Sequence, residues 1–130
     1  MNVKRVQHVS IPIPPGGATA VRSFYGNMLD MPEKQVPREL DASMLTWFAA
    51  GEDEHELHCF VDPNFQNRST AQHLCFEVDD LSALKDRIQN AGGQFDHDPT
   101  PIHNRPRAFI RDPFGNLIEL TQIIGLYEEE

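Results

Sequence analysis

The sequence lacks a long apolar run, and it contains few cysteines and few basic residues. A helix needs roughly 20 mostly apolar residues to cross a bilayer, and no stretch of this chain approaches that length. Two cysteines in 130 residues exclude a disulfide-stapled scaffold. The chain has 11 Lys and Arg against 20 Asp and Glu, a net charge of −9, which disfavours nucleic-acid phosphates and anionic membranes as partners.

The remaining composition is that of an ordinary globular protein. Hydrophobic residues make up 39% and charged residues 24% of the chain, which is typical of one domain with a single core, expected over residues 1–130. The N-terminal residues lead into a strand pattern without the apolar segment of a secretory signal, so we expect a cytoplasmic location. Cys59 and Cys75 then stay reduced, and their strand-like surroundings predict two small buried hydrophobic residues.

The stretch from Arg111 to Thr121 combines a tight turn with a carboxylate in an apolar strand. Pro113 and Gly115 favour the backbone angles of a turn, so two strands meet here. Alternation along the outgoing strand places Glu119 on a face with few polar groups. Because an isolated buried carboxylate is very costly, Glu119 must be neutralised, paired or bound to a metal.

The two halves of the chain repeat one order of elements. Residues 72–78 closely match residues 7–13, half a chain away, and such self-similarity indicates an internal repeat. In each half a strand is followed by a helical spacing and then by three short strands. The predicted helices cover about residues 18–29, ending at Asp30, and about residues 80–91. The predicted strands are residues 3–13, 33–37, 44–50 and 54–61, then 72–78, 94–97, 108–111 and 116–123. The modules are therefore about 1–63 and 71–125, with a linker at about 64–70.

Each predicted ligand strand carries an imidazole or a carboxylate. His8 and His73 occupy equivalent positions in the first strand of each half, Glu56 and His58 share one face of a later strand, and Glu119 lies in the last. If the halves pack about an approximate twofold axis, these strands face one another. Such nitrogen and oxygen donors suit Zn, Fe, Ni, Mn or Co better than Mg or Ca.

These residues resemble the vicinal oxygen chelate superfamily, the group of glyoxalases, bleomycin-resistance proteins and extradiol dioxygenases. The resemblance covers nearly the whole chain, and it implies an α+β fold. In that fold two tandem βαβββ modules form a U-shaped mixed sheet around a metal site. The residues that carry the resemblance are His8, His73, Glu119, the helix end Phe24-Tyr25 with Leu29, and the turn Arg111-Asp112-Pro113-Phe114-Gly115-Asn116.

The resemblance also implies one divalent metal and its ligands. These are His8, His73, Glu119 and either His58 or Glu56, and His58 is preferred because residues 57–59 lie where many small members read Leu-His-Leu. Glu56 then supports the ligands from outside or acts as the proton-transfer base. Glu119 is expected to take part in catalysis as well as metal binding.

We also expect Arg105 and Arg107, on the approach to the penultimate strand, to contact an anionic substrate, although arginines in such positions are as often plain surface charges.

Three functions follow from the resemblance. Four protein ligands leave about two metal positions free for a small substrate that chelates through two oxygens, which favours an isomerase, epimerase or lyase. Three ligands, His8, His73 and Glu119, leave the open face that a ring-cleaving Fe(II) dioxygenase needs. The third possibility is a metal-free, drug-sequestering binder of the bleomycin-resistance type. A homodimer is expected in each case, with neither nucleic acid nor membrane as a partner.

Overall fold

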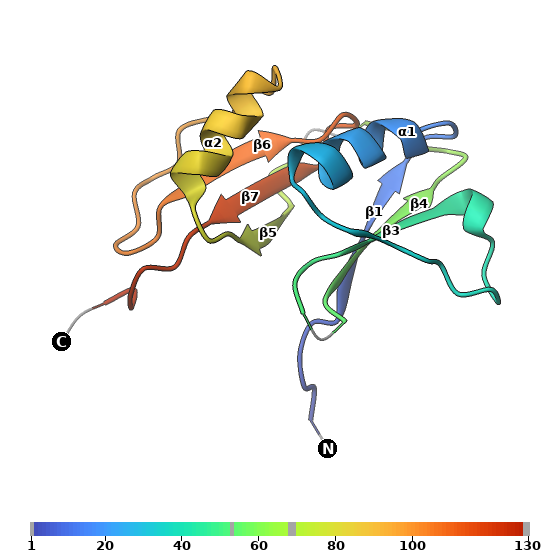
Figure 1. Ribbon diagram of the computed structural model, residues 1–130, viewed down its shortest axis with the longest axis horizontal. Helices are drawn as coiled ribbons and strands as arrows, with labels where there is room; N and C mark the ends of the chain where they lie inside the picture. Colours follow the sequence, from blue (N-terminus) through green and yellow to red (C-terminus); the bar gives the residue numbers. More distant parts are fainter. Residues whose placement is uncertain (1, 53, 68–69, 129–130) are drawn as a thin grey trace. The chain divides into compact units, whose positions relative to one another are not determined.

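The computed structural model describes residues 2–52, 54–67 and 70–128, and it divides into two compact units, Met1–Gln66 and Asn67–Glu130. The boundary between them falls in the predicted linker at 64–70, of which residues 68–69 lie outside the described part. Each unit has its own sheet and at least one helix (Figure 1). The joining of the two sheets into one U-shaped sheet, and a single domain over residues 1–130, stay predictions.

The first unit contains a four-stranded sheet in the order β1-β4-β3-β2. Its first and last strands along the chain, β1 and β4, run parallel, whereas β3 is antiparallel to both β4 and β2. The parallel pairing is possible because the helical segment and two strands intervene between β1 and β4. The strands are β1 (His8–Ile13), β2 (Glu33–Lys34), β3 (Leu45–Ala49) and β4 (Glu56–Val61).

The predicted helix of the first unit changes its winding part-way along. It begins as α1 (Ala18–Val21) and continues as the wider π-helix η1 (Arg22–Met28). The Tyr25 ring, fully buried, lies 5.8 Å from the ring of Phe48 in β3, so the helix covers the apolar face of the sheet. Asp30 then takes a φ of 58°, which confirms the predicted end of the helix. A 3-10 helix, η2 (Ala42–Met44), leads into β3.

The second unit repeats this plan with three named strands, in the order β5-β7-β6. Here too the first and last strands, β5 and β7, are parallel. The helix between them is capped by Asp80, whose carboxylate accepts a hydrogen bond of 3.0 Å from the backbone N–H of Ala83. The elements are β5 (His73–Glu77), α2 (Leu81–Asn90), β6 (Arg107–Arg111) and β7 (Leu117–Thr121).

The strand predicted over residues 94–97 is reduced to one bridge between Phe95 and Ile110. Pro99 and Pro101 follow closely, and a proline has no N–H to donate to a neighbouring strand. The predicted four-stranded module is therefore wrong in this detail for the second half, while the α+β fold with two related sheets is confirmed.

The turn between β6 and β7 forms as the sequence predicts. The Asp112 carboxylate accepts hydrogen bonds of 2.9 Å from the backbone N–H groups of Phe114 and Asn116. Gly115 takes a φ of 90°, and an added Cβ there would overlap the side chain of Asn67. The backbone angle is what requires glycine here, because the exposed Asn67 side chain could rotate away.

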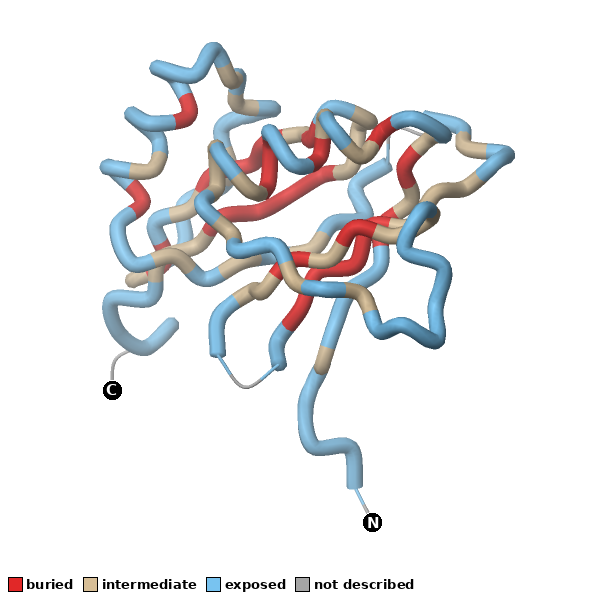
Figure 2. The backbone as a smooth tube through the Cα atoms, turned by 45° about the vertical axis from the view of Figure 1, so that its right-hand side comes forward, coloured by how far each residue is buried: buried red, intermediate tan, exposed pale blue. Residues whose placement is uncertain are grey.

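Figure 2 shows that buried residues are concentrated in the strands and on parts of the helices, whereas most loops are exposed. The middle strands, β4 and β7, are the most completely buried. Cys59 is fully buried, as predicted, but Cys75 is exposed, because it lies on β5, an edge strand of its sheet. The prediction of a buried Cys75 is therefore wrong. No helix of the described ranges has the length and apolar character needed to span a membrane.

Candidate functional site

The polar face of the first unit places His8, Glu56 and His58 together. In the register of the parallel pair, His8 lies opposite Glu56 and Ser10 opposite His58, and directly paired residues point to the same face. The imidazole rings of His8 and His58 stack with their centroids 4.1 Å apart. Trp47 of β3 is the direct strand partner of His58 and stacks on the other side of that ring. The ring centroids lie 3.6 Å apart, and the angle between the ring planes is 3°.

Glu56 is held at both of its carboxylate oxygens. Its Oε1 lies 2.8 Å from Nε2 of His58, and its Oε2 accepts a hydrogen bond from the ammonium of Lys34. The bond from Lys34 first, and that from His58 second, lower the pKa of Glu56 to about 2. Burial lowers the pKa of His58, although its hydrogen bond with Glu56 opposes that effect. An ionised carboxylate only accepts hydrogen bonds, so Nε2 of neutral His58 carries the proton and Nδ1 carries the lone pair.

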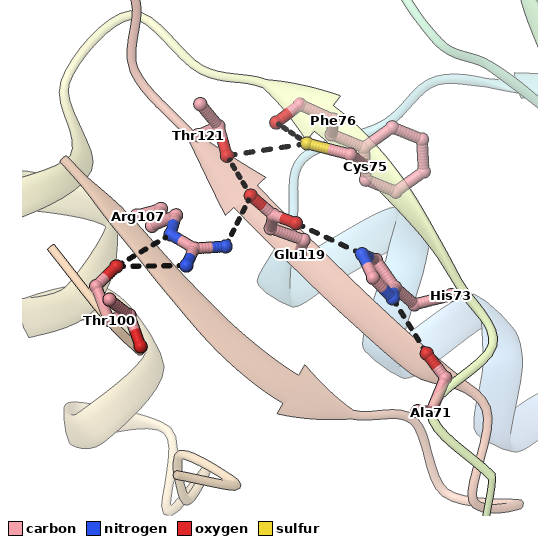
Figure 3. A network of polar contacts seen from close by, with 8 residues as sticks. All are labelled: Ala71, His73, Cys75, Phe76, Thr100, Arg107, Glu119 and Thr121. Atoms are coloured by element: carbon pink, nitrogen blue, oxygen red, sulfur yellow. Dashed lines mark hydrogen bonds and ion pairs between the residues drawn. The ribbon is translucent and has the colours of Figure 1, made fainter. Parts of the chain in front are cut away.

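In the second unit, the corresponding pair is His73 and Glu119 (Figure 3). Nε2 of His73 lies 3.0 Å from Oε1 of Glu119, and its Nδ1 lies 2.8 Å from the carbonyl oxygen of Ala71. The carbonyl can only accept, so Nδ1 carries a proton. In the neutral ring the lone pair of Nε2 then points at a carboxylate oxygen, and this arrangement is favourable only with a proton or a cation between the two atoms.

The other oxygen of Glu119 is also engaged. Oε2 accepts a hydrogen bond of 2.7 Å from the hydroxyl of Thr121, and Nη1 of Arg107 lies 3.5 Å away (Figure 3). Burial raises the pKa of Glu119, but Thr121, His73 and Arg107 together hold it below its ordinary value. Cys75 joins this network through its Sγ, 3.3 Å from the Thr121 hydroxyl. Glu119 is thus ionised and aimed at His73.

In both units the second candidate ligand lies two residues beyond the direct strand partner of the histidine. In the first, the direct partner of His8 is Glu56, and His58 lies two residues further along β4. In the second, the direct partner of His73 is Leu117, and Glu119 lies two residues further along β7. The internal repeat therefore equates His58 with Glu119, and Glu56 with a leucine, which supports His58 over Glu56 as the fourth ligand.

The two arginines that the sequence singled out have different surroundings. Arg105 is 9% exposed; its guanidinium donates to the carbonyls of Asn104 and Gly125 and lies 4.0 Å from the ring centroid of Tyr127. It anchors the C-terminal segment of its own unit. Arg107 lies beside Glu119 and donates from Nε and Nη2 to the Thr100 carbonyl, at 3.3 and 2.8 Å. Of the two, Arg107 belongs to the polar face.

Of the further residues in these networks, Lys34 was missed at the level of sequence. Trp47 can be interpreted from the sequence as a core residue or as a pocket wall, and only the pairing of β3 with β4 shows that it shares a face with His58. Alternation along β7 places Thr121 on the same face as Glu119, but its hydrogen bond to that carboxylate was not predicted.

The donors present fit a divalent metal. In each predicted histidine ligand, one ring nitrogen lies within hydrogen-bond distance of an oxygen acceptor. For His8 this nitrogen is Nδ1, which lies 2.7 Å from Oε1 of Gln7. Metal-binding histidines are typically oriented in this way. Within each unit the described residues bring one pair of preferred ligands together, His8 with His58 and His73 with Glu119. No group of three or more His, Cys, Asp or Glu side chains in the described residues is arranged to hold a metal ion.

The family model of the Glyoxalase/Bleomycin resistance protein/Dioxygenase superfamily matches residues 5–120. The chain belongs to this superfamily. A structure from Bacillus anthracis described as a glyoxalase family protein is 29% identical, with a TM-score of 0.84 over 95% of this chain and 98% of that one. A glyoxalase/dioxygenase from Nostoc punctiforme is 22% identical, with a TM-score of 0.78 over 95% and 94% of the two chains.

One curated relative matches a part of the sequence. It is a Vibrio cholerae protein named probable lactoylglutathione lyase, 34% identical over 61 residues, which are 45% of this chain. The match spans 44% of that relative's own length. Superfamily members typically use a divalent metal and bind small-molecule substrates. Membership confirms the resemblance seen in the sequence, while the activity of this chain is a matter of proposal.

Proposed function

We propose that this protein is a divalent-metal-dependent enzyme that binds a small, oxygen-rich substrate through two adjacent oxygens and acts as an isomerase, epimerase or lyase. The observation that carries the proposal is the repeated diagonal pair, His8 with His58 and His73 with Glu119. Each pair lies on a polar face between the first and last strands of its unit. The name of the Vibrio relative supports the lyase class.

The four paired residues are the proposed ligands of one metal ion, which is Zn, Fe, Ni, Mn or Co. When bound, such an ion supplies Lewis-acid stabilisation of the negative charge that develops on substrate oxygens. The chain's own contribution is orientation. The Ala71 carbonyl fixes the His73 ring, Gln7 fixes that of His8, and Glu56 fixes that of His58.

The structure favours different roles for the two carboxylates. A general base works best when its pKa lies near the working pH, and Glu56, with a pKa of about 2, is a weak base at neutral pH. Glu56 is therefore proposed to orient His58. The pKa of Glu119 is lowered as well, but by the Thr121 hydroxyl, His73 and a longer contact to Arg107 in place of an ammonium. Glu119 is proposed as the proton-transfer group as well as a ligand.

Arg107 is the proposed contact for a negatively charged group of the substrate. Its side chain is 16% exposed and already lies on the polar face beside Glu119. Arg105 is the weaker candidate, because its guanidinium is buried against the backbone carbonyls of Asn104 and Gly125.

A three-ligand iron site is the second candidate function. The observation that favours it is the engagement of His58, whose Nε2 is bonded to Glu56 and whose ring is stacked on both sides. If His58 only lines the site and does not bind the metal, His8, His73 and Glu119 form the two-histidine, one-carboxylate set of ring-cleaving dioxygenases. A metal-free drug binder is the remaining alternative, for which the net charge of −9 favours cationic ligands.

Elemental analysis of protein purified without chelators tests the proposal, for wild type, His58→Ala and His55→Ala. His55 is an exposed neighbour outside the pair and is the control. About one metal per chain, lost in His58→Ala only, supports the four-ligand site. Iron retained by His58→Ala moves the assignment to the dioxygenase and a catechol screen. Absence of metal from wild type, together with no affinity for added zinc at neutral pH, would contradict both enzymes.

Activity and assembly are tested separately. Lactoylglutathione, the compound in the name of the Vibrio relative, is the first substrate probe. The thioester absorbance is followed in both directions, from lactoylglutathione and from the glutathione and 2-oxoaldehyde that its cleavage would release, with the metal-stripped protein as the blank. A homodimer is proposed by analogy with the superfamily, and sedimentation at micromolar concentration tests it; a monomer at that concentration would contradict it.

A further inference from the structure

Two side chains outside the predicted ligand set lie next to the Glu56–His58 pair. Lys34 of β2 is the direct partner of Trp47 in β3, and Trp47 is the direct partner of His58 in β4. Directly paired residues of neighbouring strands point to the same face. Lys34, Trp47 and His58 therefore form a row across the polar face of the first unit.

Trp47 contacts His58 through ring stacking. Their ring centroids lie 3.6 Å apart at an interplanar angle of 3°. The His8 ring covers the opposite face of His58, with a centroid distance of 4.1 Å and an interplanar angle of 19°. The indole Nε1 is buried and has no hydrogen-bond partner among the described residues. An unpaired buried donor is unfavourable. The indole is therefore kept in position by its ring contacts, since no hydrogen bond of Nε1 does so.

Lys34 acts on the same imidazole indirectly. Its ammonium pairs with Oε2 of Glu56, whose other oxygen accepts from Nε2 of His58. The side chains of Glu56 and His58 are 6% and 10% exposed, and a charge buried to this extent needs an ionic partner. Without Lys34, the carboxylate would turn toward water or take up a proton, and Nε2 of His58 would lose its acceptor.

We propose that Lys34 and Trp47 are positioning residues that together form a clamp on His58. Trp47 fixes the plane of the imidazole ring, and Lys34, acting through Glu56, fixes which nitrogen carries the proton. The clamp presents Nδ1 of His58 as the nitrogen with the lone pair. The use of Nδ1 as a metal ligand rests on the proposed function, whereas the clamp is a property of the metal-free protein.

Nuclear magnetic resonance of the His58 ring tests the clamp without metal. In wild type at pH 7.5 we expect an Nε2-protonated ring whose protons are shifted upfield by the ring current of Trp47. Trp47→Leu should remove most of that shift and leave the part that comes from the stacked His8 ring, and Trp47→Phe, which keeps an aromatic ring and removes the unpaired donor, should retain more of it. Lys34→Met should keep the shift but yield a mixture of tautomers. An unchanged His58 spectrum in both Trp47→Phe and Lys34→Met would overturn the clamp, even if Trp47→Leu fails to fold.

Zinc affinity, measured by competition with a chromophoric chelator, tests the consequence for the site. Loss of a residue that orients a ligand typically weakens metal binding 10–100-fold, and we expect this of Lys34→Met and Trp47→Leu, with Trp47→Phe close to wild type. Arg22→Met is the matched control, because it removes the exposed ion pair with Glu33, the neighbour of Lys34. Equal zinc affinity in wild type and all three variants of Lys34 and Trp47 would overturn the effect on the metal.

Tryptophan fluorescence separates failure of the clamp from failure of the proposed function. Trp47 is the only tryptophan in the sequence, so its emission reports on His58 directly. Quenching by Co²⁺ that disappears in His58→Ala supports metal binding next to the indole. No response to Co²⁺ or Zn²⁺ in wild type, combined with the expected His58 spectrum, would contradict the proposed metal function while supporting the clamp.

Discussion

In both units the first and last strands are paired in the same alignment, but the side chains found at the corresponding positions differ. Both place a histidine of the first strand diagonal to a second donor on the last strand. In the first unit that donor is His58, and the carboxylate next to it, Glu56, is bound to a lysine. In the second unit the donor is itself the carboxylate, Glu119, held by a hydroxyl and a guanidinium.

This difference separates the proposed roles of the two carboxylates. Glu56 has an ammonium as its counter-charge within its own sheet. Glu119 has a longer contact to the Arg107 guanidinium, and its Oε1 also faces the Nε2 of a histidine whose other nitrogen is committed to a carbonyl. This last contact is favourable only with a proton or a cation between the two atoms. The comparison therefore supports the proposed roles, metal binding for Glu119 and orientation for Glu56, which the following variants test.

The largest expected effect comes from Glu119→Ala. Removal of a carboxylate ligand should abolish stoichiometric metal binding while the fold survives, because the strand keeps its apolar neighbours Ile118 and Leu120. Metal content and circular dichroism measure the two properties. Glu77→Ala, an exposed position at the end of β5, is the control. A variant of Glu119 that binds metal as well as wild type would remove it from the ligand set.

Breaking the ion pair of the first unit should have the next largest effect. Lys34→Met leaves the buried Glu56 carboxylate without its cation, and we expect a loss of about 1–3 kcal/mol in the free energy of unfolding. Adding Glu56→Gln in the same chain should recover much of that loss, since the uncompensated charge is then gone. Urea denaturation of the single and double variants measures the coupling. A double variant no more stable than Lys34→Met would contradict the pairing.

The pH dependence of stability should depend on Glu56. Its pKa is about 2 in the folded protein against an ordinary value of 4.5, so the unfolded state binds more protons between these values. The stabilisation is therefore complete above about pH 4.5 and is lost as the pH falls toward 2. Denaturation curves from pH 7 to pH 3 should show a shallower decline for Glu56→Gln than for wild type. Parallel declines would mean that the carboxylate is not paired in solution.

The smallest expected effect is that of Thr121→Val. It removes the hydroxyl that donates to Oε2 of Glu119, while His73 and Arg107 stay in place as partners of the carboxylate. Because that bond lowers the pKa of Glu119, the pKa should rise toward its ordinary value in the variant, and metal affinity should fall more steeply as the pH approaches that value. Zinc titrations at pH 5 and pH 7 measure this. An identical ratio of affinities in wild type and Thr121→Val would count against the role of the hydroxyl.

Much of the fold could be predicted because the repeat and the turns depend on local chemistry. The Asp112–Gly115 turn, the cap at Asp80 and the end of the first helix at Asp30 each follow from one or two residues whose backbone preferences are strong. The π-helical winding of residues 22–28 has no such local signal.

The candidate site could be predicted only in part, because neighbours on other strands decide it. The positions of His8, His58, His73 and Glu119 follow from alternation within each strand. The roles of Lys34 and Trp47 depend on how β2, β3 and β4 are aligned, and a sequence read one strand at a time does not contain that register. Cys75 was placed in the core for the same reason, since its exposure follows from the position of β5 at the edge of its sheet.

The most direct test of the division between ligand and orienting carboxylate is calorimetric zinc titration of His58→Ala beside Glu56→Ala. If His58 is the ligand, His58→Ala loses stoichiometric binding, whereas Glu56→Ala still binds about one zinc per chain with an affinity reduced 10–100-fold. The opposite result, full binding by His58→Ala and none by Glu56→Ala, would contradict the account.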